Sequence, residues 1–218
     1  RLQPGESIAS ILSVREFQED KFVMVATERG IVKKTSLMAY SKPRQGGIIG
    51  LTIDKGDRVI GAELCDGESD ILLATEKGFS IRFSEKEVRP IGRTGRGVRG
   101  IRLKKEDRVV GAEIVQPGNK FLTVTSKGYG KRTRMEEYPV QGRGGLGVMT
   151  IRCNEKTGTV VGVQQVEETD QLLVITSNGN IVRMRVNEIS VIGRNTQGVR
   201  LVGIGEGNQV VSIEKLVE

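Results

Sequence analysis

The stretch VRPIGRTGRGVRGIRL, residues 88–103, sets five arginines among four glycines and contains no acidic residue. Guanidinium groups donate charge-assisted hydrogen bonds to phosphate and carboxylate oxygens, and glycine lets a backbone approach such a group closely. We therefore expect Arg93, Arg96 and Arg99 to bind a polyanion. The alternative is a flexible surface turn whose arginines serve solubility.

Few groups in the chain could do covalent chemistry. It has no histidine, no G-x-S-x-G and no Walker A sequence, and Cys65 and Cys153 stand too far apart for a C-x-x-C metal pair. Gly95, Gly97 and Gly100 spell G-x-G-x-x-G, but no helical pattern follows them, so a dinucleotide site is excluded. We predict no catalytic residue, no metal and no cofactor.

The charge balance favours a polyanionic partner. Lys and Arg total 34 against 27 Asp and Glu, which gives a formal net charge of +7. No apolar run approaches the roughly 18 residues of a membrane span, so we expect no membrane contact. Two isolated cysteines fit buried thiols in a reducing compartment, and we predict a cytoplasmic protein.

Two markers recur along the chain with one period of about 50 residues, the range of propeller and solenoid repeats. TERG, TEKG, TSKG and TSNG form the first marker, and a glycine before a mostly apolar or alternating stretch forms the second, at Gly47, Gly97, Gly147 and Gly198. We divide the chain into repeats 5–53, 54–103, 104–154 and 155–204, with a closing strand at 205–218.

Within a repeat the apolar residues alternate with polar ones, as in GFSIRFS, which is strand patterning. The T-x-x-G step supplies a glycine for a tight hairpin turn. Each repeat therefore predicts about four short strands and no helix. The sequence predicts one all-β domain, 1–218, built as a propeller-like disc of four-stranded blades; a β-sandwich is the alternative.

Positive charge recurs with the same period. The residue four positions after each hairpin glycine is basic, namely Lys34, Arg82, Arg132 and Arg183. In a radial arrangement these residues predict a curved stripe of charge on the rim. The alternative is that they solvate the outer face and protect strand edges. Acidic residues gather elsewhere, around 63–70 and 167–170, which predicts two electrostatically distinct faces.

The predicted polyanion site contains these four positions, the arginines of the glycine-rich loops and their basic neighbours. The full set is Lys34, Arg44, Arg82, Arg93, Arg96, Arg99, Lys131, Arg132, Arg143, Arg183, Arg194 and Arg200.

Several segments resemble the C-terminal domain of the DNA gyrase A subunit: VMVATERGIVKKT, GVRGIRL, SKGYGKRT, EEYP and above all VNEISVIGRNTQGVRLV. The resemblance runs from end to end. Topoisomerase IV has a similar domain, but GRNTQGV favours gyrase. The resemblance implies a β-pinwheel whose blades exchange strands, and duplex DNA wrapped around a basic rim. It also implies negative supercoiling by an A2B2 holoenzyme, whose other parts are the remainder of the gyrase A chain and the gyrase B chain.

The chain departs from that family at the gyrase box, Q-R-R-G-G-R-G, which belongs to the first blade. Its nearest match is QGRGGLG, residues 141–147, where Gly142 and Leu146 stand in place of basic residues. We interpret it as the equivalent loop of a later blade and place the box upstream of Arg1. The competing function is a protein-interaction propeller whose basic rim meets an acidic partner.

Overall fold

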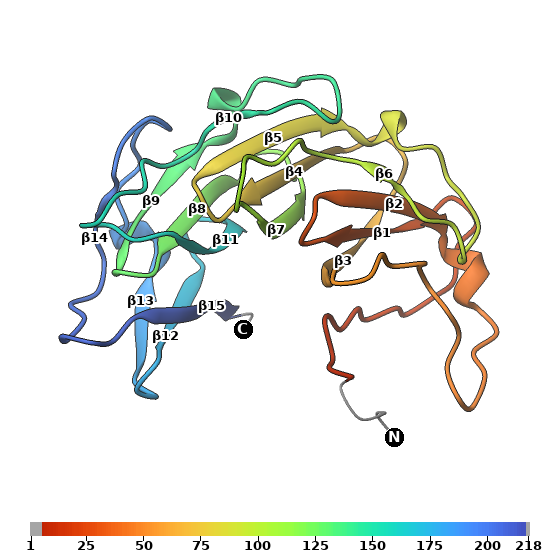
Figure 1. Ribbon diagram of the computed structural model, residues 1–218, viewed down its shortest axis with the longest axis horizontal. Helices are drawn as coiled ribbons and strands as arrows, with labels where there is room; N and C mark the ends of the chain where they lie inside the picture. Colours follow the sequence, from red (N-terminus) through yellow and green to blue (C-terminus); the bar gives the residue numbers. More distant parts are fainter. Residues whose placement is uncertain (1–5, 217–218) are drawn as a thin grey trace.

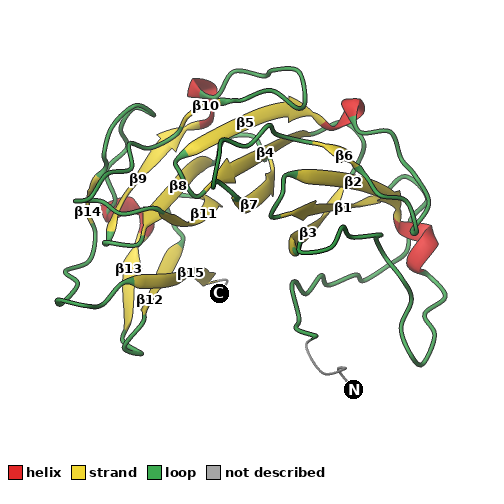
Figure 2. Ribbon diagram, in the orientation of Figure 1, coloured by secondary structure: helices red, strands yellow, loops and turns green. Residues whose placement is uncertain are grey.

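The computed structural model describes residues 6–216 as four small antiparallel sheets that follow one another along an arc (Figure 1). Strands and loops make up nearly all of this part, and the helices are short 3-10 turns (Figure 2). The predicted all-β architecture of four propeller-like repeats is therefore confirmed.

Each sheet is built around one hairpin. The first sheet has the order β3-β1-β2-β6, the second β10-β5-β4-β7, the third β11-β8-β9-β14 and the fourth β13-β12-β15. The bounds of the first seven strands are β1 (Phe22–Thr27), β2 (Ile31–Ser36), β3 (Val59–Cys65), β4 (Asp70–Thr75), β5 (Phe79–Ser84), β6 (Val98–Arg99) and β7 (Val109–Ile114). The others are β8 (Lys120–Thr125), β9 (Tyr129–Arg134), β10 (Val148–Met149), β11 (Val160–Val166), β12 (Gln171–Thr176), β13 (Ile181–Arg185), β14 (Val199–Arg200) and β15 (Val210–Leu216).

The T-x-x-G steps make the hairpin turns, as predicted. Gly78, between β4 and β5, has a φ of 82°, which L side chains rarely adopt, and a Cβ there would lie 2.3 Å from the carbonyl oxygen of Ile151. That carbonyl belongs to the segment just after β10. The glycine is therefore required both by the turn and by the approach of the next repeat.

Neighbouring repeats exchange strands. β6 pairs with β2, β10 with β5 and β14 with β9, so the outer strand of each of the first three sheets comes from the following repeat. Within residues 6–216 no strand pairs with the outer edge of β13, so the fourth sheet has three strands. The outer strands β6, β10 and β14 lie on the convex side of the arc in Figure 1.

The final segment, expected as a closing strand, forms β15 and pairs antiparallel with β12. β3, β7, β11 and β15 lie on the concave side of the arc, and each of them contacts the next in the series. Residue 5 of the first predicted repeat and residues 217–218 of the predicted closing strand lie outside the described residues.

The hydrophobic core is divided among the junctions between sheets. Met24 and Val32 of the first sheet pack in one cluster with Leu73 and Phe83 of the second. Two further clusters join the second sheet to the third and the third to the fourth. Because apolar burial is the main favourable term in folding, each sheet depends on its neighbours for stability.

Four 3-10 turns follow the hairpins, each directly after the hairpin's second strand. They are η1 (Leu37–Tyr40), η2 (Glu85–Glu87), η3 (Met135–Glu137) and η4 (Val186–Glu188). The first residue of each turn is buried, so each turn is fixed against the sheets.

Candidate nucleic-acid interface

Arg82, one of the predicted stripe residues, lies between two repeats. Its Nε donates to Asp70 Oδ2 at 2.8 Å, within the same hairpin. Its Nη1 donates to the carbonyl oxygens of Met135 and Tyr138, at 3.1 and 3.4 Å, in the 3-10 turn of the following repeat. Only 20% of the side chain is exposed. The guanidinium therefore caps η3: it adds a second donor to the Met135 carbonyl, which already accepts the backbone N–H of Tyr138, and it binds the carbonyl of the residue that follows the turn.

Arg132 repeats this arrangement one junction further along. Its Nε donates to the carbonyl oxygen of Ile189 at 2.7 Å and its Nη2 to that of Asn187 at 3.3 Å, both at η4. Its Nη1 lies 2.7 Å from Glu168 Oε2. Hydrogen bonds from Lys120 and Arg132 lower the pKa of Glu168 to about 2, so this carboxylate is charged throughout the neutral range.

Lys34 makes the corresponding contact in the first junction. Its Nζ donates to the carbonyl oxygen of Glu85 at 2.8 Å and lies 3.5 Å from Glu85 Oε2. Both side chains are buried. The ammonium group thus caps η2 as the two guanidinium groups cap η3 and η4.

The structure therefore does not form the predicted exposed stripe from Lys34, Arg82 and Arg132. The repeat places these residues where the hairpin of one unit meets the 3-10 turn of the next, and the turn's carbonyl groups and nearby carboxylates occupy them. The expectation of separate acidic and basic faces is wrong at these positions, because Asp70 and Glu168 pair with the arginines. Arg183, the fourth member, is exposed on β13 and donates to Gln171.

The loop arginines form a second repeated set. Arg93, Arg143 and Arg194 are half-buried in loops 91–97, 141–147 and 192–198. Each donates through Nη1 to a carbonyl oxygen one repeat earlier, that of Ile49 at 2.9 Å, of Arg99, and of Met149 at 2.7 Å. The backbone N–H groups of Arg143 and Arg194 donate to carboxylates of Glu87 and Glu137.

These loops join the outer strands into a continuous surface. The backbone N–H of Arg102 donates to the carbonyl oxygen of Gly145 at 2.8 Å, and that of Arg152 to Thr196 at 2.9 Å. The segments that follow β6 and β10 are thereby fixed to the loop of the following repeat. The convex side of the arc is built from this alternation of strand and loop (Figure 1).

Exposed arginines follow this convex surface, and we call them the arginine belt. Its members are Arg44, Arg96, Arg99, Arg102, Arg152 and Arg200. Four of the six were predicted, and Arg102 and Arg152 were missed. Both follow a repeat-marking glycine by five positions, so the alignment of repeats contained the signal. Arg96 also forms an ion pair with Asp54, and both side chains are largely exposed.

Lys131, also predicted as a contact, is fully buried. Its Nζ donates to the carbonyl oxygens of Gly193, at 2.6 Å, and of Arg194, and to Thr196 Oγ1 at 3.0 Å. Its partners therefore all belong to the loop that carries Arg194. Burial lowers the pKa of Lys131 to about 8.

Two acidic side chains lie inside the concave series of strands. Glu63 on β3 accepts a hydrogen bond from the backbone N–H of Ile114 on β7 at 2.9 Å, and Glu113 on β7 accepts one from Gln165 on β11. Burial, and then the charge of Glu113, raise the pKa of Glu63 to about 7. Burial also raises the pKa of Glu113.

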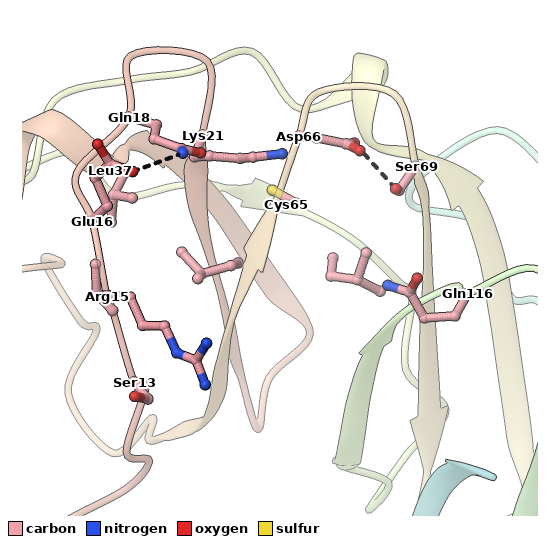
Figure 3. Close-up of a pocket in the computed structure, with 13 residues that line it drawn as sticks. Ser13, Arg15, Glu16, Gln18, Lys21, Leu37, Cys65, Asp66, Ser69 and Gln116 are labelled. Carbon is pink, nitrogen blue, oxygen red and sulfur yellow. Dashed lines mark hydrogen bonds between the residues drawn. The ribbon is translucent and has the colours of Figure 1, made fainter. Parts of the chain in front are cut away.

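A cleft of about 620 Å³ lies between the N-terminal segment and the turn after β3 (Figure 3). Arg15 and Lys21 line one wall, and Asp66 and Gln116 line the other. Burial raises the pKa of the Cys65 thiol in this cleft, which makes it a poor nucleophile at neutral pH. Among residues 6–216 there is no group of three metal-ligating side chains and no helix long and apolar enough to cross a membrane.

Comparison with known families gives four matches along the chain. The model of the family described as "DNA gyrase C-terminal domain, beta-propeller" matches residues 21–66, 69–116, 119–167 and 170–216. Each match contains one hairpin and the concave-side strand that follows it. The sequence and the family model therefore give the same number of repeats, although each family match begins about 15 residues after the predicted start of the repeat.

Individual relatives agree with this match. The chain is 56% identical to the DNA gyrase A protein of Buchnera aphidicola subsp. Acyrthosiphon pisum and 46% identical to that of Salmonella typhimurium, over all of the chain but 26% and 25% of those proteins. A solved DNA gyrase A C-terminal domain superposes with a TM-score of 0.88 at 24% identity, over 99% of this chain and 72% of that one. A topoisomerase IV C-terminal domain gives 0.87 at 25% identity, over 93% and 64%.

Replacing Arg132 with Met is expected to destabilise the fold by about 1–3 kcal/mol, because it leaves the carbonyl groups of Asn187 and Ile189 without their donor, while the half-exposed Glu168 keeps its ion pair with Lys120. Urea unfolding followed by circular dichroism measures this. Arg185→Met is the control, because Arg185 is 73% exposed, and its effect should stay within about 0.5 kcal/mol. Equal effects of the two variants would contradict the capping role of Arg132.

Stability is expected to fall as pH rises from about 4.5 to 7. The pKa of Glu63 is near 7 in the fold and near 4.3 in an unfolded chain, so the folded state alone keeps the proton in this interval. The stabilisation is fully present below the unfolded pKa and is lost by about pH 7, at an expected 2–3 kcal/mol. Urea unfolding at a series of pH values measures the effect. Glu63→Gln should flatten this dependence and the exposed Glu155→Gln should not; an unchanged slope in Glu63→Gln would refute the assignment.

Proposed function

Because this chain belongs to the DNA gyrase C-terminal domain family, we propose that it binds duplex DNA along the arginine belt and catalyses no reaction itself. The observation that carries the proposal is the continuity of the belt. Exposed arginines recur on outer strands and loops that are joined by hydrogen bonds from repeat to repeat. A curved row of positive charge suits a bent polyanion better than a small ligand.

The belt would contact the phosphate backbone. Phosphate contacts position a protein on DNA without reading its sequence, and they must offset the cost of bending a stiff duplex. We assign direct contacts to the six belt residues, with Arg93, Arg143 and Arg194 beside them in the loops and Arg183 on β13. Lys34, Arg82, Lys131 and Arg132 are assigned to holding the repeats together.

Within a whole enzyme, the domain would wrap DNA so that strand passage introduces negative supercoils. Its partners would be the remainder of the gyrase A chain and the gyrase B chain in an A2B2 assembly, in the bacterial cytoplasm at the nucleoid. The chain spans about a quarter of the length of the curated relatives it matches, so these partners and the ATP-driven reaction belong to the larger protein. The identity with gyrase A proteins supports gyrase over topoisomerase IV.

A protein-interaction propeller is the competing function, and the first test separates the two. We expect affinity for a duplex of several helical turns to exceed that for a single turn, and to fall steeply with salt. If about 6 to 8 phosphates are neutralised, log K against log salt should slope at roughly −5 to −7. Affinity that is indifferent to duplex length, or matched by a disordered acidic peptide of equal charge, would contradict wrapping and favour a protein partner.

The belt itself is tested by removing the two arginines that sequence reasoning missed. Arg102→Ala with Arg152→Ala should weaken binding to all sequences alike and make the salt slope shallower by about 1 to 2. Lys55→Ala with Lys105→Ala removes the same charge from exposed turns at the hairpin end of the sheets and is the control. The measurement is the affinity of both double variants for duplex DNA across a salt series. Equal losses of affinity in the two variants would show that only net charge matters.

A further inference from the structure

Two buried lysines hold the loops that carry the loop arginines. In the third junction, Lys131 on β9 donates to two carbonyl oxygens and one hydroxyl of loop 192–198, one of them the carbonyl of Arg194 itself. In the first junction, Lys33 on β2 donates to the carbonyl oxygens of Gly50, at 2.7 Å, and of Arg93. Both lysines are at most 1% exposed, so neither can touch a ligand directly.

The two contacts are equivalent in the repeat. Lys33 and Lys131 both stand three positions after the hairpin glycine, and Arg93 and Arg194 both stand four positions before a repeat-marking glycine. In each junction an ammonium group from one repeat binds the backbone carbonyl of the loop arginine of the next. The same pair, a buried lysine and the backbone of a loop arginine, therefore occurs at equivalent positions in two junctions.

The middle junction provides an internal comparison. There the equivalent residue on β5 is Ile81, and its Cδ1 lies 3.5 Å from the position of a Cβ on Gly145. Loop 141–147 is thus in apolar contact with β5 where the other two loops are bound by charge. The same fold therefore holds two of these loops with a buried lysine and the third with an apolar contact.

Two of the three loop arginines are not fully satisfied by the protein. Within the described part of the chain, the Nε atoms of Arg143 and Arg194 are buried without an acceptor, while Nη1 of each donates to an outer-strand carbonyl. A guanidinium held at one nitrogen and fixed at its own carbonyl presents its remaining donors in one orientation. Such preorganisation reduces the ordering cost of binding an anion.

We propose that Lys33 and Lys131 are positioning residues for DNA binding: their buried ammonium groups fix the backbone of Arg93 and Arg194, so that these arginines face the phosphates in a set orientation. The inference rests on the proposed function, because it assigns a role within the same site. It predicts that each lysine acts on affinity through its own arginine and not through the arginine of another loop.

The charges around Lys131 give the proposal a second consequence. Burial and the charge of Arg194 lower its pKa, and the carboxylate of Glu137 on η3 raises it, leaving it at about 8. Burial raises the pKa of Tyr138, whose ring faces the Arg194 guanidinium, to about 12, so this phenol stays neutral in the same pH range. A bound phosphate would favour the ammonium form and raise the pKa of Lys131. Affinity should then fall as pH rises from about 7 to 9, since a ligand that favours protonation binds less well where the free protein has lost the proton.

The test is a double-mutant cycle on duplex affinity with the 218-residue chain. Lys131→Met and Arg194→Ala should each weaken binding about tenfold, as the loss of one charge-assisted contact would, and together no more than either alone. The losses of affinity caused by Lys131→Met and by Arg143→Ala should multiply in the double variant, because Ile81 and not a lysine contacts the Arg143 loop. Independent, multiplying effects of Lys131→Met and Arg194→Ala would overturn the inference and leave the proposed function intact. No duplex binding by the unmodified chain would overturn both.

Two measurements keep the inference testable if Lys131→Met folds poorly. In the unmodified chain, affinity should fall about threefold to tenfold between pH 7 and 9, which corresponds to a rise of up to about one pKa unit on binding; a flat profile would overturn the proposal. In a folded Lys131→Met, amide hydrogen exchange without DNA should speed up in loop 192–198 and stay unchanged in loop 141–147. Equal protection of loop 192–198 in both proteins would also overturn it.

Discussion

The contact between the hairpin of one repeat and the 3-10 turn of the next is the constraint on which the rest of this structure depends. The carbonyl groups at these short turns can accept further hydrogen bonds besides those made within the turn. Here a basic side chain from the preceding repeat satisfies them in three successive junctions. With apolar clusters shared between sheets, these contacts fix the angle between neighbours, and the curve of the arc follows from repeating that angle.

The same constraint divides the positive charge into two populations. Lys34, Arg82 and Arg132, on the second hairpin strands of the first three sheets, lie inside the junctions and bind carbonyl and carboxylate oxygens. The residues of the arginine belt face solvent. The net charge of +7 therefore understates how much the charge differs between the junctions and the outer surface. Loop 192–198 serves both, because its carbonyl oxygens accept from the buried Lys131 while its Arg194 donates to the outer strand β10.

Much of the architecture could be predicted from the sequence, since hairpin glycines and alternating apolar residues are local signals that recur with one period. The prediction about Lys34 and Arg132 failed for a physical reason. Alternation assigns one face of a strand to solvent, but β2 and β9 are covered on both faces, as four consecutive buried residues in each show. What covers the second face is the following repeat, and no pattern within one repeat reports it. Arg102 and Arg152 stand at equivalent positions when the repeats are aligned. They were missed because they lie just beyond the glycine-rich loops.

Strand exchange has a consequence for synthesis on the ribosome. β2 ends at Ser36, but its outer partner β6 begins at Val98, so the edge of the first sheet stays open while roughly 60 residues are added, which takes a few to about ten seconds at typical rates. Open edges invite pairing with other chains, and lysine on an edge strand discourages it. Lys33 and Lys34 occupy that edge until the next repeat emerges. The side chains that later hold the junction would thus first protect the nascent chain from association.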